Sequence, residues 1–432
     1  MAVPGEPALR GGAYLVGVAR AGAVTGDVEE HVDELAALAD TAGFGESGRA
    51  ILPLRVPTPA TFIGRGQAED VGVIAREMGA SLVVVDEDLG PAQVRNLEKI
   101  FDLPVVDRAG LIIDIFAQRA RSREARLQVE MARLEYLLPR LAGRWAHLSR
   151  QVGGGRGGLK GEGEKQIELD RRMIRRRIDH LRRDLKRVDR SRDVRRRARR
   201  ALPEAALVGY TNAGKSSLFN ALARSNVKVE DRLFATLDPT VRRVDLGRRG
   251  TFLLKDTVGF IRKLPHHLVA SFRSTFEEAG EAELLVLVVD LAHPASAEQQ
   301  QVAERVIEET GLGHLPRLLV FNKADLAGAE LVRAVEHRHP QAVVVSARTG
   351  AGLDHLAGAL ADRLLGREIT GTVTIPAARG DALAFAQRSG VVERLVSVDG
   401  LVRLTLRAPQ RAFTQLDDML RQERRDEGAR PA

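Results

Sequence analysis

The sequence predicts a multidomain α/β protein with four parts: an N-terminal α/β domain, a long helical hairpin, a central doubly wound α/β domain and a small C-terminal α/β domain. Three observations lead to this prediction. Short apolar runs alternate with amphipathic stretches in the first and third parts, an apolar heptad repeat fills the stretch between them, and the 432 residues exceed the usual size of one domain. The predicted domains are residues 1–118, 119–200, 201–368 and 369–432.

The composition is that of a soluble protein, with 44% hydrophobic and 29% charged residues. The chain has no cysteine, which excludes disulfides and thiolate metal sites. Residues 1–12 lack the basic start and apolar stretch of a signal peptide. The longest strongly apolar run, residues 284–289, is far below the roughly 20 residues that a membrane span needs. We therefore expect a soluble, cytoplasmic monomer with no membrane span, and peripheral membrane association is left open.

The N-terminal part alternates strand-like and helix-like stretches. Residues 13–18 and 51–56 are predicted strands, with an amphipathic helix between them on Val32, Leu35 and Leu38. Residues 81–85 and 104–106 are two further predicted strands, separated by a helix that starts near Pro91. No catalytic constellation is found in this domain.

Residues 120–200 are predicted to form a helical hairpin. The apolar positions of the first helix are spaced alternately by four and three residues, which is a heptad seam: Leu127, Met131, Leu134, Leu138, Leu141, Trp145 and Leu148. The second helix continues the pattern at Ile167, Ile174, Ile178, Leu181, Leu185 and Val188. Between them, residues 153–163 contain seven glycines in eleven residues and predict a flexible tip. Pro139 is expected to kink or break the first helix.

The positive charge of the chain is concentrated in the second helix of this hairpin. Residues 171–200 contain 16 Arg or Lys and 4 Asp, a local charge of +12 in a chain whose net charge is +8. The rest of the chain is therefore slightly acidic. This distribution is typical of a polyanion-binding arm on a neutral body, whereas a merely solvated helix face usually mixes both signs.

The third part reads as a doubly wound α/β domain, and the fourth adds two or three short strands, such as residues 371–375 and 401–406. Predicted strands of the third part are residues 205–208, 241–246, 251–255, 284–289, 318–321 and 342–345. A P-loop follows the first of these strands and opens a helix; its residues are Gly209, Tyr210, Thr211, Asn212, Ala213, Gly214, Lys215 and Ser216. Lys215 is expected to reach the β and γ phosphates of a nucleotide, and Ser216 to supply a hydroxyl to Mg²⁺.

Three further motifs follow in the order found in guanine-nucleotide switches. Asp256, after a strand, is placed to hold a magnesium-bound water, and the Gly259 amide to contact the γ phosphate. Asp325 can accept both N1–H and N2–H of guanine, a pair of donors that adenine lacks. Backbone amides after Ser346 are available for guanine O6. The predicted nucleotide-binding residues of these motifs are Asp256, Thr257, Val258, Gly259, Asn322, Lys323, Ala324, Asp325, Ser346, Ala347 and Arg348.

The residues of these motifs resemble those of the HflX family of P-loop GTPases. Residues 234–240 (FATLDPT) are similar to its switch I and residues 256–261 (DTVGFI) to its switch II. The likeness covers roughly residues 50–370 and includes N-terminal and hairpin stretches, namely residues 62–67, 91–97, 114–120 and 161–172. The hairpin stretch departs from the family at residues 161–165, which read GEGEK where GPGET is expected.

The resemblance implies a cytoplasmic GTPase that binds the large ribosomal subunit and ribosomal RNA and separates stalled or idle ribosomes. It also implies that Phe234, Ala235, Thr236, Leu237 and Asp238 contact GTP. The resemblance assigns Thr236 to Mg²⁺ beside Ser216, whereas the residues alone do not separate it from Thr240. The predicted catalytic set is then Lys215, Thr236, Asp256 and Gly259.

The position after Gly259 is Phe260, where Ras-like enzymes carry a water-orienting Gln. Phenylalanine cannot orient water, so we expect slow intrinsic turnover that a partner stimulates. We place this residue on a mobile switch. Two other functions stay open at this point: a large-subunit assembly GTPase, and a non-ribosomal GTP-binding module that remodels RNA or protein.

Overall fold

The structure, a computed structural model, describes residues 11–20, 25–141, 160–197, 202–224, 233–263 and 279–427. The chain divides into two compact units. The first unit comprises Met1–Arg195, Glu230–Asp238 and Ile261–Ser274. The second comprises Arg196–Val229, Pro239–Phe260 and Thr275–Ala432. The predicted α/β fold class is confirmed in both.

The N-terminal domain of the first unit is a four-stranded parallel sheet in the order β2-β1-β3-β4. The strands β1 and β3 are near-continuous apolar runs because helices cover the sheet, whereas the edge strand β2 is more polar. The buried cluster joins strand residues such as Val83 and Val85 to helix residues such as Leu97 and Phe101. In chain order the elements are β1 (Gly12–Arg20), α1 (Thr25–Ala42), β2 (Gly45–Leu54), α2 (Arg65–Glu77), β3 (Ala80–Val85), α3 (Pro91–Phe101), β4 (Val105–Asp107) and α4 (Arg108–Arg119).

The hairpin consists of α5 (Arg123–Leu137), the short 3-10 helix η1 (Leu138–Arg140) and the long helix α7 (Lys160–Arg197). α5 ends just before Pro139, whose ring is incompatible with a continuing helix. Eight of the predicted heptad residues form one apolar cluster between the two helices: Met131, Ile178 and Leu181 with Leu127, Leu134, Leu138, Ile174 and Leu185. The predicted seam positions Leu141 and Val188 are not part of this cluster. The predicted seam positions Trp145 and Leu148 lie outside the described residues.

The predicted extent of the glycine-rich tip is wrong at its C-terminal end. α7 already begins at Lys160, so residues 160–163 are helical rather than part of a loop. Each glycine inside a helix costs about 1 kcal/mol relative to alanine. Neighbouring Glu162, Glu164 and Lys165 are strong helix formers, and propagation from a long helix adds one hydrogen bond per residue. The remaining tip residues, 153–159, lie outside the described part of the chain.

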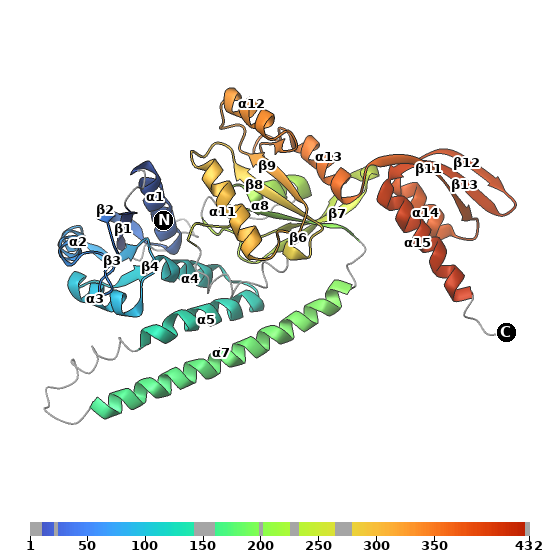
Figure 1. The fold of residues 1–432 in the computed structure, drawn as a ribbon. Coiled ribbons are helices and arrows are strands. Elements are labelled where there is room, and N and C mark those ends of the chain that lie inside the picture. The colour runs from blue at the N-terminus through green and yellow to red at the C-terminus, as the bar shows by residue number, and fades with distance from the viewer. Residues whose placement is uncertain are drawn as a thin grey trace, which may run out of the picture. The chain divides into compact units, whose positions relative to one another are not determined.

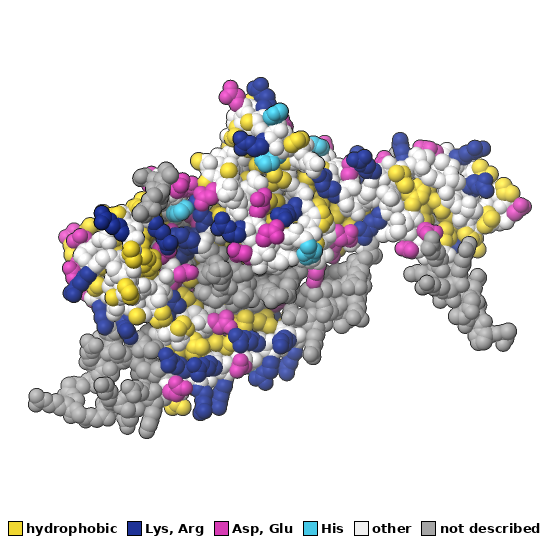
Figure 2. Space-filling model, viewed as in Figure 1, with side chains coloured by type: hydrophobic (Ala, Val, Ile, Leu, Met, Phe, Trp, Pro, Cys, Tyr) yellow, Lys and Arg dark blue, Asp and Glu magenta, His cyan; other side chains and the backbone are white. Residues whose placement is uncertain are grey.

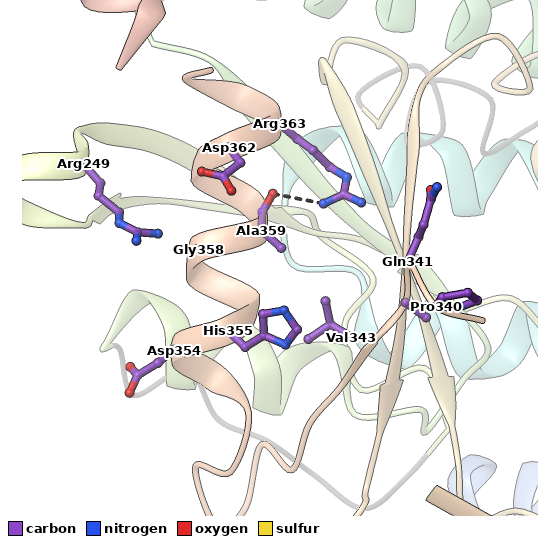
Figure 3. Close-up of a pocket in the computed structure, with 11 residues that line it drawn as sticks. Arg249, Pro340, Gln341, Val343, Asp354, His355, Gly358, Ala359, Asp362 and Arg363 are labelled. Carbon is purple, nitrogen blue, oxygen red and sulfur yellow. Dashed lines mark hydrogen bonds between the residues drawn. The ribbon is translucent and has the colours of Figure 1, made fainter. Parts of the chain in front are cut away.

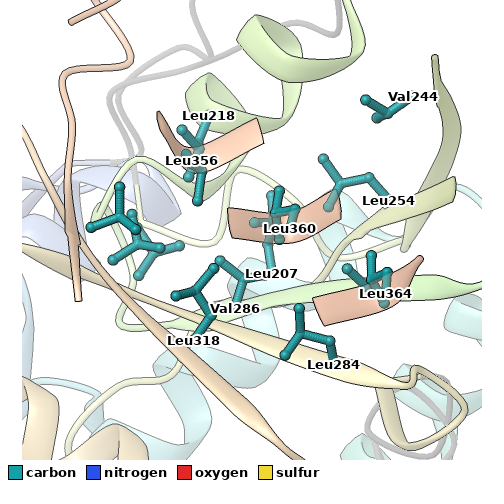
Figure 4. Packing of buried hydrophobic residues seen from close by; sticks show 14 of the residues in the cluster. Leu207, Leu218, Val244, Leu254, Leu284, Val286, Leu318, Leu356, Leu360 and Leu364 are labelled. Atoms are coloured by element: carbon teal, nitrogen blue, oxygen red, sulfur yellow. The ribbon is translucent and has the colours of Figure 1, made fainter. Parts of the chain in front are cut away.

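The central domain of the second unit is a six-stranded sheet in the order β10-β9-β8-β5-β7-β6. Only β6 is antiparallel to its neighbour. Strand side chains such as Leu207 and Val286 pack on Leu218, Leu356 and Leu360 from the helices (Figure 4). Its elements are β5 (Glu204–Gly209), α8 (Lys215–Ala223), β6 (Thr240–Asp245), η2 (Gly247–Arg249), β7 (Thr251–Asp256), β8 (Leu284–Asp290), α11 (Ser296–Glu309), β9 (Arg317–Asn322), α12 (Ala329–Arg338), β10 (Val343–Val344) and α13 (Leu353–Leu364).

The C-terminal domain is a three-stranded antiparallel sheet in the order β11-β13-β12, with two helices on one side (Figure 1). Alternate residues of β13, among them Leu404 and Leu406, are buried against Ala382, Ala386 and Leu416 of the helices. Its elements are β11 (Glu368–Pro376), α14 (Gly380–Ser389), β12 (Val391–Val398), β13 (Leu401–Pro409) and α15 (Gln410–Glu427).

Candidate nucleotide-binding site

Four parallel strands of the central sheet end side by side at one edge. β5 ends at Gly209, β7 at Asp256, β8 at Asp290 and β9 at Asn322, and the strand register aligns these ends. The carboxyl edge of a parallel sheet is where open α/β folds bind ligands. The fold therefore collects the P-loop, the Asp256 motif and the Asn322 motif in one place.

The P-loop needs glycine at both of its ends. Gly209 has φ +143° and lies against Val288, so that a Cβ atom would stand 2.2 Å from the Val288 carbonyl oxygen. Gly214 has φ +87° and would bring a Cβ to 2.2 Å from the Asn322 amide nitrogen. Both conformations disfavour any other residue. The loop then delivers the chain into the N-terminus of α8, whose free N–H groups form an anion site.

Lys215 is buried at the start of α8. Its ammonium donates to the carbonyl oxygens of Gly209, at 3.0 Å, and Tyr210, at 2.7 Å. Burial lowers the pKa of Lys215 to about 8, and the nearby Asp256 carboxylate opposes this shift in part. The charge is thus held inside the loop, in surroundings where an anion would be strongly attracted.

Because the pKa of the buried Lys215 is lowered, GTP binding should be linked to proton uptake. Phosphate oxygens beside Lys215 favour its charged form and raise its pKa again. Affinity should therefore be constant below pH 8 and fall as the pH rises from about 8 toward the ordinary value of 10.5. Calorimetry at pH 8 in buffers of different ionisation enthalpy should show uptake of about half a proton per GTP. Lys215→Arg, which stays charged, should show none; no uptake by the parent would contradict the assignment.

The Asp256 motif is tied directly to the P-loop. The Ser216 hydroxyl donates to the Asp256 carboxylate at 2.6 Å, and the Thr257 hydroxyl donates to the Leu207 carbonyl at 2.6 Å. A Cβ on Gly259 would stand 2.9 Å from the Lys215 ammonium nitrogen, so this glycine lies against the lysine of the P-loop. A carboxylate and a hydroxyl at hydrogen-bond distance are hard oxygen donors of the kind that suit Mg²⁺.

Phe260, which we placed on a mobile switch, has a buried side chain in this structure. Its side chain is 1% exposed. Its backbone N–H donates to Gly209 at 2.9 Å, and its carbonyl accepts from Thr211 at 2.7 Å. The ring is buried, and the backbone at this point continues the pairing of β5. A water-orienting role is therefore excluded for this side chain by position as well as by chemistry.

Asn322 links the base motif to the phosphate loop. Its amide nitrogen donates to the Ala213 carbonyl at 3.0 Å, and its amide oxygen accepts from the Ala347 N–H at 3.0 Å. Lys323 has φ +62° and pairs with Asp290 at 2.7 Å. Asp290 was not among the residues predicted for this site. Its position at the end of the buried run 284–289, at the same sheet edge, was the available indication.

The Asp325 carboxylate is held in place by the third motif. It accepts from the Ser346 hydroxyl at 2.6 Å and lies 3.3 Å from the Arg348 guanidinium. The hydrogen bond from Ser346 is the main reason that the pKa of Asp325 is lowered. The group is consequently ionised at working pH, as an acceptor for two guanine N–H donors must be.

The switch I residues cluster with the first unit rather than with the P-loop's unit. Phe234 packs edge-on against Phe116 of α4, with ring centroids 4.7 Å apart. The Asp238 carboxylate accepts from the backbone N–H groups of Arg121 and Ser122, at 2.9 and 3.0 Å, at the start of α5. We predicted that Asp238 contacts GTP; here its carboxylate serves a helix N-terminus instead. Thr236 belongs to the same segment.

The residues just after Phe260 also belong to the first unit. Arg262 pairs with Glu30 at 2.7 Å. Lys263 pairs with Asp86 at 2.8 Å and with Glu87 at 2.9 Å, and Asp86 also pairs with the fully buried Arg108. The chain after the predicted switch II thus continues into an electrostatic network of the N-terminal domain, which the sequence motifs did not indicate.

A separate hollow of about 460 Å³ lies elsewhere on the central domain (Figure 3). It is lined from α13 by His355 and Arg363, from the start of β10 by Gln341 and Val343, and by Arg249 of η2. None of the motif residues lines it. Its polar side chains carry both signs of charge, so the hollow defines no ligand class.

No helix in the described part of the chain is both long and apolar enough to cross a bilayer. Within the described ranges, no group of three or more His, Cys, Asp or Glu could hold a metal ion.

The doubly wound sheet and the motifs at its carboxyl edge define a P-loop GTPase. The chain is 43% identical over 386 residues to GTPase HflX of Escherichia coli strain K12, covering 88% of this chain and 90% of that protein. It therefore belongs to the HflX family of GTPases. GTPase HflX of Magnetococcus marinus is 46% identical over 367 residues, 84% of each chain. GTPase HflX of Akkermansia muciniphila is 40% identical over 428 residues, covering 96% and 98%.

Family profiles account for most of the chain. Residues 29–117 match the N-terminal and residues 119–199 the middle region of GTP-binding GTPases. Residues 204–323 match a profile described as 50S ribosome-binding GTPase, and residues 330–429 match the HflX C-terminal domain. A solved structure of SsGBP with GDP is 25% identical, covers 82% of this chain and 98% of that one, and has a TM-score of 0.45.

Proposed function

We propose that this GTPase binds the large ribosomal subunit and, in its GTP-bound state, separates stalled or idle ribosomes. The observation that carries the proposal is the basic face of α7. Arg172, Arg175 and Arg176 are exposed, and no ion pair involves them among the described side chains. Figure 2 shows Lys and Arg side chains gathered along this helix. The matched profile described as 50S ribosome-binding GTPase supports the same partner.

The long helix α7 of the hairpin has some arginines that pair with α5 and others that are exposed to solvent. Its inner arginines are fixed to α5, with Arg177 at 2.7 Å from Glu130 and Arg182 at 2.8 Å from Glu135. These pairs tie α7 to α5, whereas Arg172, Arg175 and Arg176 are left for an external polyanion. A rigid row of guanidinium groups suits the phosphates and stacked bases of folded RNA.

The nucleotide site would act as the switch through direct chain continuity. Gly259 lies beside Lys215, and within four residues the chain reaches Arg262 and Lys263, which pair with Glu30, Asp86 and Glu87 of the N-terminal domain. Loss of the γ phosphate at Gly259 would thus move the chain segment that carries Arg262 and Lys263 and so change the geometry of these ion pairs. Switch I offers a second connection through Asp238 and the start of α5.

Magnesium fits this site. We propose Ser216 and Thr236 as its protein ligands, with Asp256 orienting a bound water; the ion would supply charge neutralisation at the β and γ phosphates. The proposed nucleotide contacts are those predicted from sequence, apart from the Asp238 side chain. Lys215 binds the phosphates, Gly259 donates its N–H to the γ phosphate, and Asp325 selects guanine.

Gradient sedimentation of intact ribosomes with this protein and a non-hydrolysable GTP analogue tests the proposal. We expect separated subunits, with the protein migrating with the large one. Alone, the protein should turn over GTP at about 10⁻⁴ to 10⁻² s⁻¹, and added large subunits should raise this rate. Intact ribosomes with no co-migrating protein would refute the proposal. Binding to large-subunit precursors without separation of ribosomes would favour an assembly role.

The hairpin tip gives a sharper version of this test. Replacing residues 153–163 with a short neutral linker should leave GTP affinity unchanged, since these residues are far from the P-loop in sequence. It should reduce ribosome separation and ribosome-stimulated hydrolysis roughly tenfold or more, because phosphate contacts are lost. A control tip with the same residues in scrambled order keeps the charge and tests whether shape matters. If the linker variant separates ribosomes as well as the parent does, the tip only connects the two helices and has no role in binding.

A further inference from the structure

The sheet of the C-terminal domain has one covered and one open face. α14 and α15 cover the face that carries Val402, Leu404, Leu406 and Ala408 of β13. The intervening β13 residues must project to the other face, because side chains alternate along a strand. Arg403 and Arg407 on that second face are exposed, and we call it the open face.

The strand register fixes which residues share the open face. Arg407 lies opposite Thr370 on β11 and Val391 on β12. Thr405 lies opposite Thr372 and Arg394, and Arg403 lies opposite Thr374 and Val396. The result is a lattice of three arginines and four threonines across three strands, with the Thr372 and Thr405 hydroxyls 3.1 Å apart.

The charge on this face is segregated from the rest of the domain. Residues 368–427 contain nine arginines and nine acidic residues, so the domain as a whole is neutral. On the open face, however, Glu368 stands at one corner and Glu393 at the β12 bulge, while Arg403 and Arg407 lie on the central strand β13 and Arg394 lies on β12. A surface built only for solubility would intersperse both signs.

The arginines of the open face are not used within the domain. Arg394, Arg403 and Arg407 are exposed, and among the described residues none of them has an ion pair. Arg379 and Arg411, on the other side, pair with Asp381 and Glu283. At one end of the sheet Val398 and Leu401 are 58% and 46% exposed, which adds an apolar strip beside the basic lattice.

We propose that the open face of β11-β13-β12 binds the sugar–phosphate backbone of folded RNA, with Arg394, Arg403 and Arg407 as phosphate ligands. Threonine hydroxyls donate to phosphate or 2′-hydroxyl oxygens, and the apolar strip packs on sugars. The face has no aromatic side chain for stacking bases, so recognition is by backbone and shape rather than by sequence. The proposal rests on the proposed function only for the identity of the RNA as ribosomal.

The test compares three triple variants of the full chain on a labelled RNA stem-loop and on large ribosomal subunits. The first carries Arg394→Gln, Arg403→Gln and Arg407→Gln. The second carries lysine at the same positions. The third, a matched control, carries Arg333→Gln, Arg338→Gln and Arg388→Gln, which remove the same charge from exposed helix positions. Basal GTP hydrolysis and the melting temperature, measured for each, verify folding.

The glutamine variant should bind the stem-loop roughly tenfold more weakly at physiological salt, and its slope of log affinity against log salt should fall by about 2 to 3. The lysine variant should keep most of the affinity, and the control should keep the parent's slope. Parental affinity and slope in the glutamine variant would overturn the proposal. So would weaker binding to large subunits with unchanged binding to the stem-loop, since the face would then recognise protein.

The same substitutions made in the linker-tip variant show whether the open face and the hairpin contribute independently to RNA affinity. Additive losses of stem-loop affinity are expected for two independent contacts. If the parent fails to bind ribosomes yet binds the stem-loop through the open face, the proposed function fails and this inference stands. If ribosomes are separated normally by the glutamine variant and stem-loop binding is unchanged, this inference fails and the proposed function stands.

Discussion

Lys215→Ala is expected to weaken GTP binding roughly a hundredfold or more and to abolish hydrolysis. The substitution removes a charge-assisted partner of the phosphates from a desolvated loop, a loss that typically exceeds 3 kcal/mol. Direct titration with a fluorescent GTP analogue and a single-turnover assay measure the two effects. Lys99→Ala, at an exposed position of α3, is the control and should behave as the parent.

The loss should not arise from misfolding. The lowered pKa of Lys215 shows that the free protein gains nothing from keeping this group charged. Nucleotide-free Lys215→Ala should therefore melt within a few degrees of the parent, whereas GTP should stabilise the parent alone. If Lys215→Ala binds GTP with parental affinity, the assignment of Lys215 to the phosphate site is wrong.

Asp325→Asn is expected to remove most of the preference for guanine. The parent should favour GTP over ATP by several kcal/mol, because a wrong base leaves the polar groups of the site without partners. Asparagine keeps one acceptor and gains an N–H donor, which opposes the N2–H of guanine. GTP affinity should fall about a hundredfold while ATP affinity changes little.

A gain of function makes this result specific. Xanthine carries a carbonyl where guanine carries the N2 amino group, so the new donor of Asp325→Asn should improve binding of XTP. Competition between the three nucleotides measures this directly. Asp362→Asn, at an exposed position of α13, is the matched control. Equal affinity of the parent for GTP and ATP would exclude the assigned role of Asp325.

The buried strands were predictable because burial on both faces leaves a continuous apolar run. Residues 284–289 became β8, with all seven residues of the strand buried. β2 was predicted from residue 51 but begins at Gly45, because its first half, GESGRA, lies on an edge strand and lacks an apolar pattern. α4 was not predicted: its core LIIDIF is a β-like apolar run, which Asp107 caps through the Gly110 N–H at 2.9 Å.

The sequence alone determined the chemistry of the nucleotide site. A P-loop, an Asp after a strand and an Asn-Lys-x-Asp motif must meet when their strands are parallel neighbours, since the side chains that end such strands share one edge. The sequence also determined the apolar seam of the hairpin and the charge of α7, because both depend on local spacing.

Only the tertiary structure decided how these parts are joined. Asn322 links two loops 109 and 25 residues away, and Asp238 caps a helix 116 residues before it. Lys263 finds its acidic partners 177 residues upstream. Phe260 is buried because its backbone extends the pairing of β5. No local pattern encodes such contacts, since each depends on which surfaces meet after the sheets have formed, and burial then selects the partner that satisfies each charge or hydrogen bond.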